Sequence, residues 1–167
     1  MSYTLVDTEL GRLGLVGSTA GLRRIVLPRP SQQSVLQLIM EGLPGAMADP
    51  SPFGDLPHRL KRYLKGEQVA FDDELDFTGA TPFRCAVWLA TRAIPYGQTK
   101  SYGWVAQQIG KPKACRAVGQ ALAKNHLPIV VPCHRVVSKD GSLRGFGGGL
   151  AMRKRLLEIE ALSHQAN

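Results

Sequence analysis

Residues 101–124 read SYGWVAQQIGKPKACRAVGQALAK, and their spacing predicts two short helices joined by a glycine turn. Ser101 is a favourable N-cap for the first helix, and Gly110 is expected to end it. Pro112 is expected to open the second helix, because the first turn of a helix needs no N–H from that position. The apolar positions recur at helical spacing: Val105, Ala106 and Ile109, then Ala114, Ala117, Val118, Ala121 and Leu122. Two helices in this arrangement indicate a helix-turn-helix.

The opposite face of the second helix carries long polar side chains, most of them positive. They recur at steps of three and four residues: Lys113, Arg116, Gln120 and Lys124. Such a stripe suits the phosphates of a nucleic acid, although an ordinary solvated helix face has a similar composition.

The charge of the chain is divided unevenly, and this favours the nucleic acid. Residues 1–78 hold 8 Lys+Arg and 10 Asp+Glu, a net charge of −2. Residues 79–167 hold 13 Lys+Arg and 3 Asp+Glu, a net charge of +10. A strongly basic half beside a nearly neutral one indicates a surface that faces a polyanion.

The first half of the chain has the pattern of a small β-sheet. Three β-rich runs, at residues 3–6, 13–17 and 22–27, are separated by candidate tight turns at residues 8–11 and 18–21. Residues 28–31 break the pattern with two prolines. Helices are expected at residues 34–41 and 57–65, and the acidic residues 72–76 are expected to form a solvated loop or an edge strand.

The basic half is expected to begin with a helix capped by Thr81, with Pro82 at its first position and Ala86, Leu89 and Ala90 on its apolar face. Together these patterns predict an α+β fold. A small N-terminal β-sheet domain with flanking helices would span residues 1–78. A mainly helical domain of the winged-helix or helix-turn-helix type would span residues 79–167.

Residues 127–137, LPIVVPCHRVV, carry the most informative chemistry. An apolar run flanked by prolines predicts a buried segment in an extended path. A thiol in such a run is normally inert, yet His134 and Arg135 are residue types that can turn Cys133 into a nucleophile. In a strand, neighbouring side chains point to opposite faces, so His134 would reach the sulfur only through a water or a helical turn. The local chemistry leaves a structural and a nucleophilic Cys133 both open.

Pro132-Cys133-His134-Arg135, between Ile129-Val130-Val131 and Val136-Val137, resembles the active-site signature of the O6-alkylguanine-DNA alkyltransferases, also called methylated-DNA–protein-cysteine methyltransferases. The resemblance continues in order through residues 94–97, 101–103, 117–119, 125, 148–150 and 156–157. These segments cover most of residues 80–160. The first half of the chain resembles the family only in its general character.

The resemblance implies a repair reaction in which Cys133 irreversibly accepts an alkyl group, once per protein. The substrate would be O6-alkylguanine in DNA, mainly O6-methylguanine, with O4-methylthymine as a further candidate. His134 would act through a water as the base that holds the thiolate, and Glu160 would orient His134. Glu158 is the alternative for that orienting role.

The resemblance also implies a set of DNA-binding residues around a flipped base. Tyr102 would rotate the 3′ phosphate and donate a proton to the guanine, and Arg116 would fill the gap left by the base. Asn125 would be the hinge between the recognition helix and the active-site segment. The remaining expected contacts to DNA or substrate are Lys113, Gln120, Arg135, Val136, Phe146, Gly147 and Gly148.

Three other functions fit part of the sequence. A sensor that binds alkylated guanine without reacting is disfavoured, because proteins of that kind usually lack the cysteine. A helix-turn-helix regulator with a structural Cys133 leaves the placement of His134 and Glu160 unexplained. A cysteine hydrolase gives no reason for the basic stripe.

The cysteines and histidines indicate which cellular compartment and which cofactors to expect. Three cysteines, Cys85, Cys115 and Cys133, do not make a disulfide framework, so we expect a reducing, cytoplasmic setting. No apolar run is long enough to span a membrane. The histidines form no ligand-spaced cluster, so no metal is expected, and the resemblance implies no organic cofactor. We expect a monomer that binds double-stranded DNA containing O6-alkylguanine.

Overall fold

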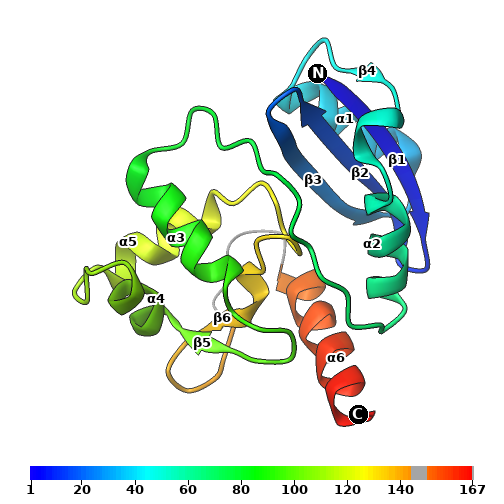
Figure 1. The fold of residues 1–167 in the computed structure, drawn as a ribbon. Coiled ribbons are helices and arrows are strands. Elements are labelled where there is room, and N and C mark those ends of the chain that lie inside the picture. The colour runs from blue at the N-terminus through cyan, green and yellow to red at the C-terminus, as the bar shows by residue number, and fades with distance from the viewer. Residues whose placement is uncertain (144–149, 167) are drawn as a thin grey trace. The chain divides into compact units, whose positions relative to one another are not determined.

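The computed structural model describes residues 1–143 and 150–166, with side chains as far as residue 163. These residues form two compact units, Met1–Phe77 and Thr78–Asn167, which divide one residue before the boundary expected from the sequence (Figure 1). The predicted α+β fold class is confirmed, with a sheet in the first unit and mainly helices in the second. Among the described residues, no helix combines the length and the apolar character needed to traverse a bilayer.

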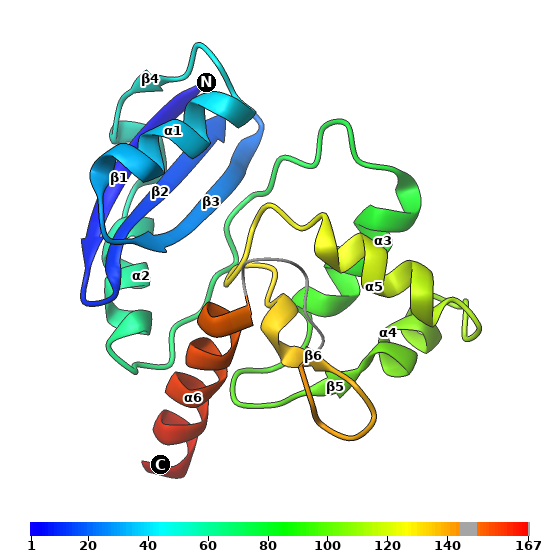
Figure 2. The same cartoon turned by 180° about the vertical axis from the view of Figure 1, so that it is seen from behind.

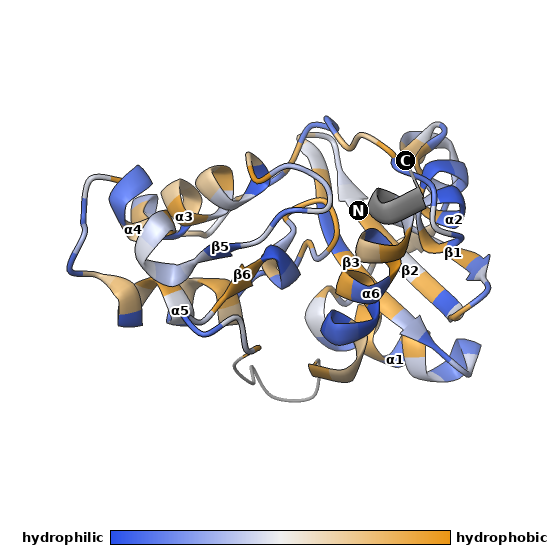
Figure 3. Ribbon diagram, turned by 90° about the horizontal axis from the view of Figure 1, so that it is seen from below, coloured by the Kyte–Doolittle hydropathy of each residue, from blue (hydrophilic) through white to orange (hydrophobic). Residues whose placement is uncertain are grey.

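The first unit is built on a meander of three antiparallel strands, as the sequence predicts. They are β1 (Ser2–Thr8), β2 (Gly11–Ser18) and β3 (Gly21–Arg29), and the short β4 (Met47–Ala48) pairs with β1 in parallel. The sheet order is β3-β2-β1-β4. The strand β3 runs through Pro28 and Arg29, where the sequence analysis expected it to have ended. The central strand β2 is buried along most of its length and is drawn largely in orange and white in Figure 3.

Two helices cover opposite faces of this sheet, α1 (Gln32–Gly42) and α2 (Leu56–Leu64), as the two views in Figure 1 and Figure 2 show. A 3₁₀ turn, η1 (Ser51–Phe53), precedes α2. The helix α1 begins where the Ser31 side chain accepts a hydrogen bond from the Ser34 N–H. It packs Val35 and Ile39 against Val16 and Val26 of the sheet, which builds the core on that face.

Of the acidic residues 72–76, Asp72 and Glu74 are exposed, while the backbone of Glu74 and Asp76 is hydrogen-bonded to Leu22 of the sheet. Leu75 forms an isolated parallel bridge with Leu22, so the segment pairs with the edge of the sheet at one position without forming a strand. The buried Asp76 accepts a 2.6 Å hydrogen bond from the Ser18 hydroxyl and pairs with Arg23.

The second unit begins with α3 (Pro82–Arg92), which Thr81 caps as predicted by accepting a hydrogen bond from the Arg84 N–H. The predicted apolar face of this helix is wrong. Leu89 is 55% exposed, and the helix instead buries Val87, Trp88 and Thr91. The reason is the Trp88 indole, which turns inward and donates a 2.9 Å hydrogen bond to the Ala121 carbonyl of the third helix in this unit.

The predicted helix-turn-helix is present as α4 (Tyr102–Gln108) and α5 (Cys115–Ala123). Ser101 caps α4 through a hydrogen bond from the Trp104 N–H. The helix α5 begins at Cys115, so the expectation that Pro112 opens it is wrong. Pro112 lies in the turn between the helices, where its missing N–H is equally harmless. The predicted inner face is confirmed, because Val118, Ala121 and Leu122 are buried.

Two short strands and a long helix complete the second unit. The strand β5 (Lys100–Ser101) pairs in parallel with β6 (Val136–Val137), and α6 (Leu150–Ala166) ends the described chain. The 3₁₀ turn η2 (Cys133–Arg135) immediately precedes β6 and contacts α6.

Candidate active site

The segment before Cys133 is buried as predicted, but it is not extended. The Val131 N–H donates a 2.8 Å hydrogen bond to the Leu127 carbonyl, which closes a tight turn. Ile129 lies in this turn with φ of 75°, a left-handed conformation that is unfavourable for a β-branched residue. Backbone strain of this kind persists only where the surrounding structure enforces it.

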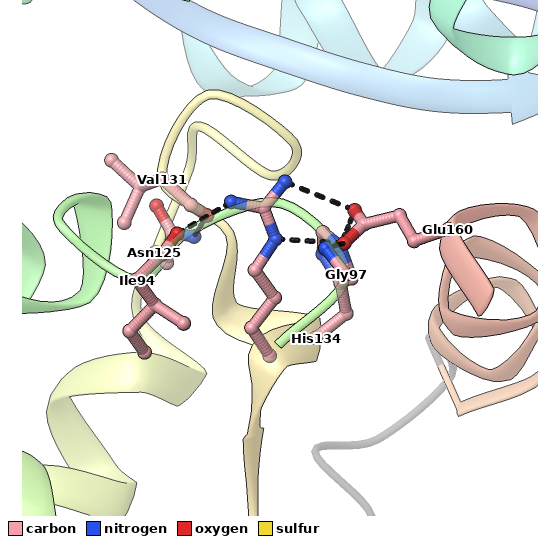
Figure 4. Close-up of polar contacts among 7 residues, drawn as sticks. Ile94, Gly97, Asn125, Val131, His134 and Glu160 are labelled. Atoms are coloured by element: carbon pink, nitrogen blue, oxygen red, sulfur yellow. Dashed lines mark hydrogen bonds and ion pairs between the residues drawn. The ribbon is translucent and has the colours of Figure 1, made fainter. Parts of the chain in front are cut away.

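Asn125 supplies part of that enforcement. Its side-chain amide donates a 3.0 Å hydrogen bond to the Val131 carbonyl, and its side-chain oxygen accepts a 2.9 Å hydrogen bond from the Leu127 N–H. Asn125 lies two residues after the end of α5, and Figure 4 shows it beside Val131. The side chain therefore joins the end of the recognition helix to the segment that carries Cys133.

Cys133 and His134 follow in the 3₁₀ turn η2, where Cys133 is 3% exposed and His134 is 1% exposed. In a 3₁₀ turn successive side chains are about 120° apart, rather than on opposite faces as in a strand. A helical turn was one of the two arrangements expected to bring His134 near the sulfur. The 3₁₀ turn η2 is such a helical turn.

His134 is paired with a carboxylate from the C-terminal helix. Its Nε2 lies 2.6 Å from Glu160 Oε2, and Glu160 is 1% exposed. Figure 4 shows Glu160 projecting from α6 toward His134 and Gly97. Glu158, the alternative partner, is half-exposed on the same helix and lies 3.6 Å from Arg155. The geometry thus pairs His134 with Glu160.

The pKa values of this pair fix where the protons lie. Burial raises the pKa of Glu160, but hydrogen bonds from His134 and Arg135 outweigh it and lower the pKa to about 2. Burial lowers the pKa of His134, and the hydrogen bond to Glu160 does not fully reverse this. Glu160 is therefore ionised and His134 neutral near pH 7. The His134 Nε2 must carry the proton shared with Glu160, which leaves the lone pair on Nδ1.

Arg135 was expected to contact DNA, and the structure places its guanidinium elsewhere. The side chain is 8% exposed and donates to Glu160 through Nε at 2.9 Å and Nη2 at 3.1 Å. A third hydrogen bond, from Nη1 to the Ile94 carbonyl, measures 2.7 Å. Arg135 belongs to the support of Glu160, and not to an exposed DNA-binding surface.

The expected DNA-binding stripe of α5 is exposed along its length. Arg116 and Gln120 lie on α5 itself, whereas Lys124 is its C-cap and Lys113 lies in the turn before it, because the helix begins later than expected. Tyr102, at the start of α4, is half-buried and lies close to Gly119 of α5. A Cβ at position 119 would be 3.9 Å from the Tyr102 ring. The helix-turn-helix thus brings Tyr102 beside the basic stripe.

The other expected site residues divide into two groups. Val136 is buried in β6, where it pairs with Lys100. Phe146, Gly147 and Gly148 lie outside the described residues.

The sequence analysis did not find the role of the Gly97 N–H, which donates a 3.1 Å hydrogen bond to Glu160 Oε1. No sequence signal could have found a backbone donor 63 residues from its acceptor.

No group of metal-ligating side chains is present among the described residues. What the second unit holds is a DNA-reading motif, a basic exposed helix and a buried cysteine beside a neutral histidine that is paired with a carboxylate. These features define the class of DNA-binding proteins that carry a nucleophilic cysteine.

Comparison with known proteins gives the family. Residues 82–162 match the family described as "6-O-methylguanine DNA methyltransferase, DNA binding domain", and residues 1–77 match "6-O-methylguanine DNA methyltransferase, ribonuclease-like domain". The methylated-DNA–protein-cysteine methyltransferase of Mycobacterium tuberculosis is 41% identical over 158 residues, which covers 95% of this chain and 91% of that protein. The enzyme of the same name from Methanosarcina acetivorans is 35% identical over 160 residues, covering 96% and 98%.

Solved structures agree. The crystal structure of the Mycobacterium tuberculosis O6-methylguanine methyltransferase matches with a TM-score of 0.79 and 39% identity, covering 97% of this chain and 93% of that one. The crystal structure of the Mycobacterium tuberculosis protein in complex with DNA matches with a TM-score of 0.81 and 39% identity, covering 98% and 94%. The chain belongs to the methylated-DNA–protein-cysteine methyltransferase family.

Proposed function

We propose that this protein repairs double-stranded DNA by moving the alkyl group of O6-alkylguanine, mainly O6-methylguanine, onto Cys133. The observation that carries the proposal is the buried Cys133 in the same 3₁₀ turn as His134, whose Nε2 faces the ionised Glu160. A neutral histidine, which carries a lone pair on one ring nitrogen, is the group that a buried thiol needs in order to become a thiolate. A thiol that only filled space would need no such partner.

The reaction balances without a cofactor. The Cys133 sulfur attacks the methyl carbon, a sulfur–carbon bond forms, and the bond between that carbon and the guanine O6 breaks. The thiol proton passes through a water to His134 Nδ1, and the departing base takes up one proton to become guanine. Tyr102 is the proposed donor to the base, and the proton gained by His134 is released to solvent, from which the Tyr102 phenolate regains its own. The thioether has no route back to a thiol, so each protein reacts once.

The target oxygen is inaccessible inside a stacked duplex, so the damaged nucleotide must be flipped into the site. Lys113 and Gln120 are proposed to hold the backbone, and Arg116 to occupy the space that the base leaves. The exposure of Arg116 and Gln120 on α5, and of Lys113 in the turn before it, supports this assignment. Phosphate contacts would offset the few kcal/mol that unstacking costs. The proposed setting is the cytoplasm, where the three free cysteines remain reduced, and the proposed working unit is the monomer.

The test is to locate the transferred group. The protein is mixed with a duplex carrying one O6-methylguanine, digested, and analysed by peptide mass spectrometry. The proposal predicts a methylated peptide containing Cys133 and none in the Cys133→Ser variant. The Cys115→Ser variant is the matched control, because Cys115 is an exposed thiol on the recognition helix. Methylation at Cys115 instead, or lesion binding with no methylation at all, would contradict the proposal.

A further inference from the structure

Glu160 is held by more donors than the orientation of one histidine requires. Within the described residues, its Oε1 accepts from Arg135 Nε at 2.9 Å and from the Gly97 N–H at 3.1 Å. Its Oε2 lies 2.6 Å from His134 Nε2 and accepts from Arg135 Nη2 at 3.1 Å. A carboxylate has about four lone-pair directions, so these four donors leave it little freedom to rotate.

Arg135 is itself fixed on three sides. Its guanidinium donates hydrogen bonds to both oxygens of Glu160 and, from Nη1, to the Ile94 carbonyl. It also lies 5.7 Å from the centre of the Tyr96 ring. Ile94 and Gly97 both belong to the segment that follows α3, and Figure 4 shows Gly97 close to the Glu160 carboxylate. The end of α3 and the C-terminal helix therefore meet on this one arginine, which neighbours His134 in sequence.

We infer that Arg135 is a positioning residue of the alkyl-transfer site: it neutralises Glu160, so that Glu160 can orient His134 without drawing a proton onto it. The inference rests on the proposed function, in which His134 must remain neutral to accept the Cys133 proton. A lone buried carboxylate beside His134 would favour the imidazolium, which has no lone pair to offer. A carboxylate already paired with a guanidinium attracts the proton much less.

The charges around His134 are consistent with this role. The groups that face it are the Glu160 carboxylate, the Arg135 guanidinium beside it in η2, and Arg153, which is buried on α6. Burial lowers the pKa of His134 most, Glu160 raises it, and the positive charges of Arg135 and Arg153 lower it again. Removing the charge of Arg135 therefore moves the pKa of His134 upward. A purely structural arginine would leave the titration of His134 in place.

The experiment compares Arg135→Gln, which can still donate a hydrogen bond but carries no charge, with Arg135→Lys, which keeps the charge but loses the planar fork. The titration of His134 is followed by NMR of the histidine-labelled full chain. The single-turnover rate with an O6-methylguanine duplex is measured from pH 5 to pH 9. The control is Arg155→Gln, since Arg155 pairs with Glu158 on the exposed face of α6, the helix that carries Glu160.

In Arg135→Gln, the His134 midpoint and the acid limb of the rate profile are both expected to move up by at least about one pH unit. In Arg135→Lys, both midpoints should stay near those of the wild type while the rate falls several-fold, because the charge remains and the alignment is lost. The Arg155→Gln control should change neither quantity.

An unchanged His134 midpoint in a folded Arg135→Gln protein would overturn the inference. If that variant does not fold, a one-unit shift in Arg135→Lys would overturn it as well. The NMR titration does not depend on catalysis, so it separates the two proposals. Absence of methyl transfer in the wild type would refute the proposed function, whereas an unmoved titration would refute only the role of Arg135.

Discussion

His134 and Glu160 are 26 residues apart in sequence, and their side chains meet at 2.6 Å in the interior of the second unit. The contact joins the 3₁₀ turn η2 to the C-terminal helix α6. His134 lies in the same turn as Cys133, but it is held by Glu160 from α6. Any change that loosens α6 is expected to reach Cys133 through this pair.

Replacement of Glu160 by glutamine is expected to abolish most of the transfer activity and to destabilise the protein by about 3–5 kcal/mol. Glutamine can still accept from His134, but the buried Arg135 guanidinium loses its counter-charge. Denaturant unfolding and a single-turnover rate measure the two effects. The control Glu158→Gln removes a half-exposed carboxylate from the same helix and should change stability by less than about 1 kcal/mol. Equal effects of the two substitutions would contradict the site.

The stability of the protein is expected to fall as the pH drops below about 6.5, the ordinary value for histidine. The folded-state pKa of His134 is lowered by burial, so the unfolded chain binds a proton that the folded chain resists. Unfolding by urea at several pH values gives the slope. His134→Gln should lose part of that slope, whereas His58→Gln, at an exposed position of α2, should keep it. A slope unaffected by His134→Gln would show that His134 titrates as it does in the unfolded chain.

A second acid-dependent loss is expected from Glu160. Its folded pKa of about 2 lies below the ordinary 4.5, so its stabilising effect is complete above about pH 4.5 and disappears as the pH falls toward 2. Acid unfolding followed by circular dichroism tests this, with Glu160→Gln expected to flatten the curve in that window. The same steepness in the variant would assign the transition to other carboxylates.

The effects of the two hydrogen bonds made by the Asn125 side chain are expected to be separable by substitution. Asn125→Asp keeps an acceptor for the Leu127 N–H but loses the donor to the Val131 carbonyl, whereas Asn125→Ala loses both. We expect a loss of stability of about 1–3 kcal/mol in Asn125→Ala, and a reduced transfer rate in both variants. If Asn125→Asp transferred the methyl group at the wild-type rate, the Val131 contact would not position the turn before Cys133.

The exposed face of α5 is expected to account for much of the salt dependence of DNA binding. Each of Lys113→Ala and Lys124→Ala should lower the slope of log affinity against log salt by about 1, since each removes one expected phosphate contact. Fluorescence anisotropy with an undamaged duplex measures the slope. The control Lys61→Ala removes an exposed positive charge from α2 in the first unit. A change in slope of equal size for Lys61→Ala would place the DNA elsewhere.

Local signals in the sequence predicted the elements well where a single residue sets a boundary. Ser101 and Thr81 cap their helices because a hydroxyl at that position accepts from an N–H three residues later. Pro112 misled the prediction, since proline fits a turn as well as a first helical turn. The inward face of α3 depends on the hydrogen bond from Trp88 to the Ala121 carbonyl, 33 residues away, which spacing cannot reveal.

In the site, too, residue types could be predicted from the sequence, whereas contacts between distant segments could not. The residue types at Cys133 and His134 indicated a nucleophile and its base, and the resemblance to a family added Glu160. The tight turn at residues 127–131 could not be predicted, because the Asn125 side chain holds it through hydrogen bonds with the Val131 carbonyl and the Leu127 N–H. The direction of Arg135 was equally hidden, since an arginine beside an active cysteine can face either DNA or an interior carboxylate.

The most direct test of the account is the intact mass of the protein after titration with increasing amounts of O6-methylguanine duplex. We expect the mass to rise by one methylene per chain, to saturate at one equivalent, and to stay unchanged in Cys133→Ser. A mass that never changes despite tight binding, or turnover of several equivalents by one unmodified chain, would contradict irreversible transfer to Cys133.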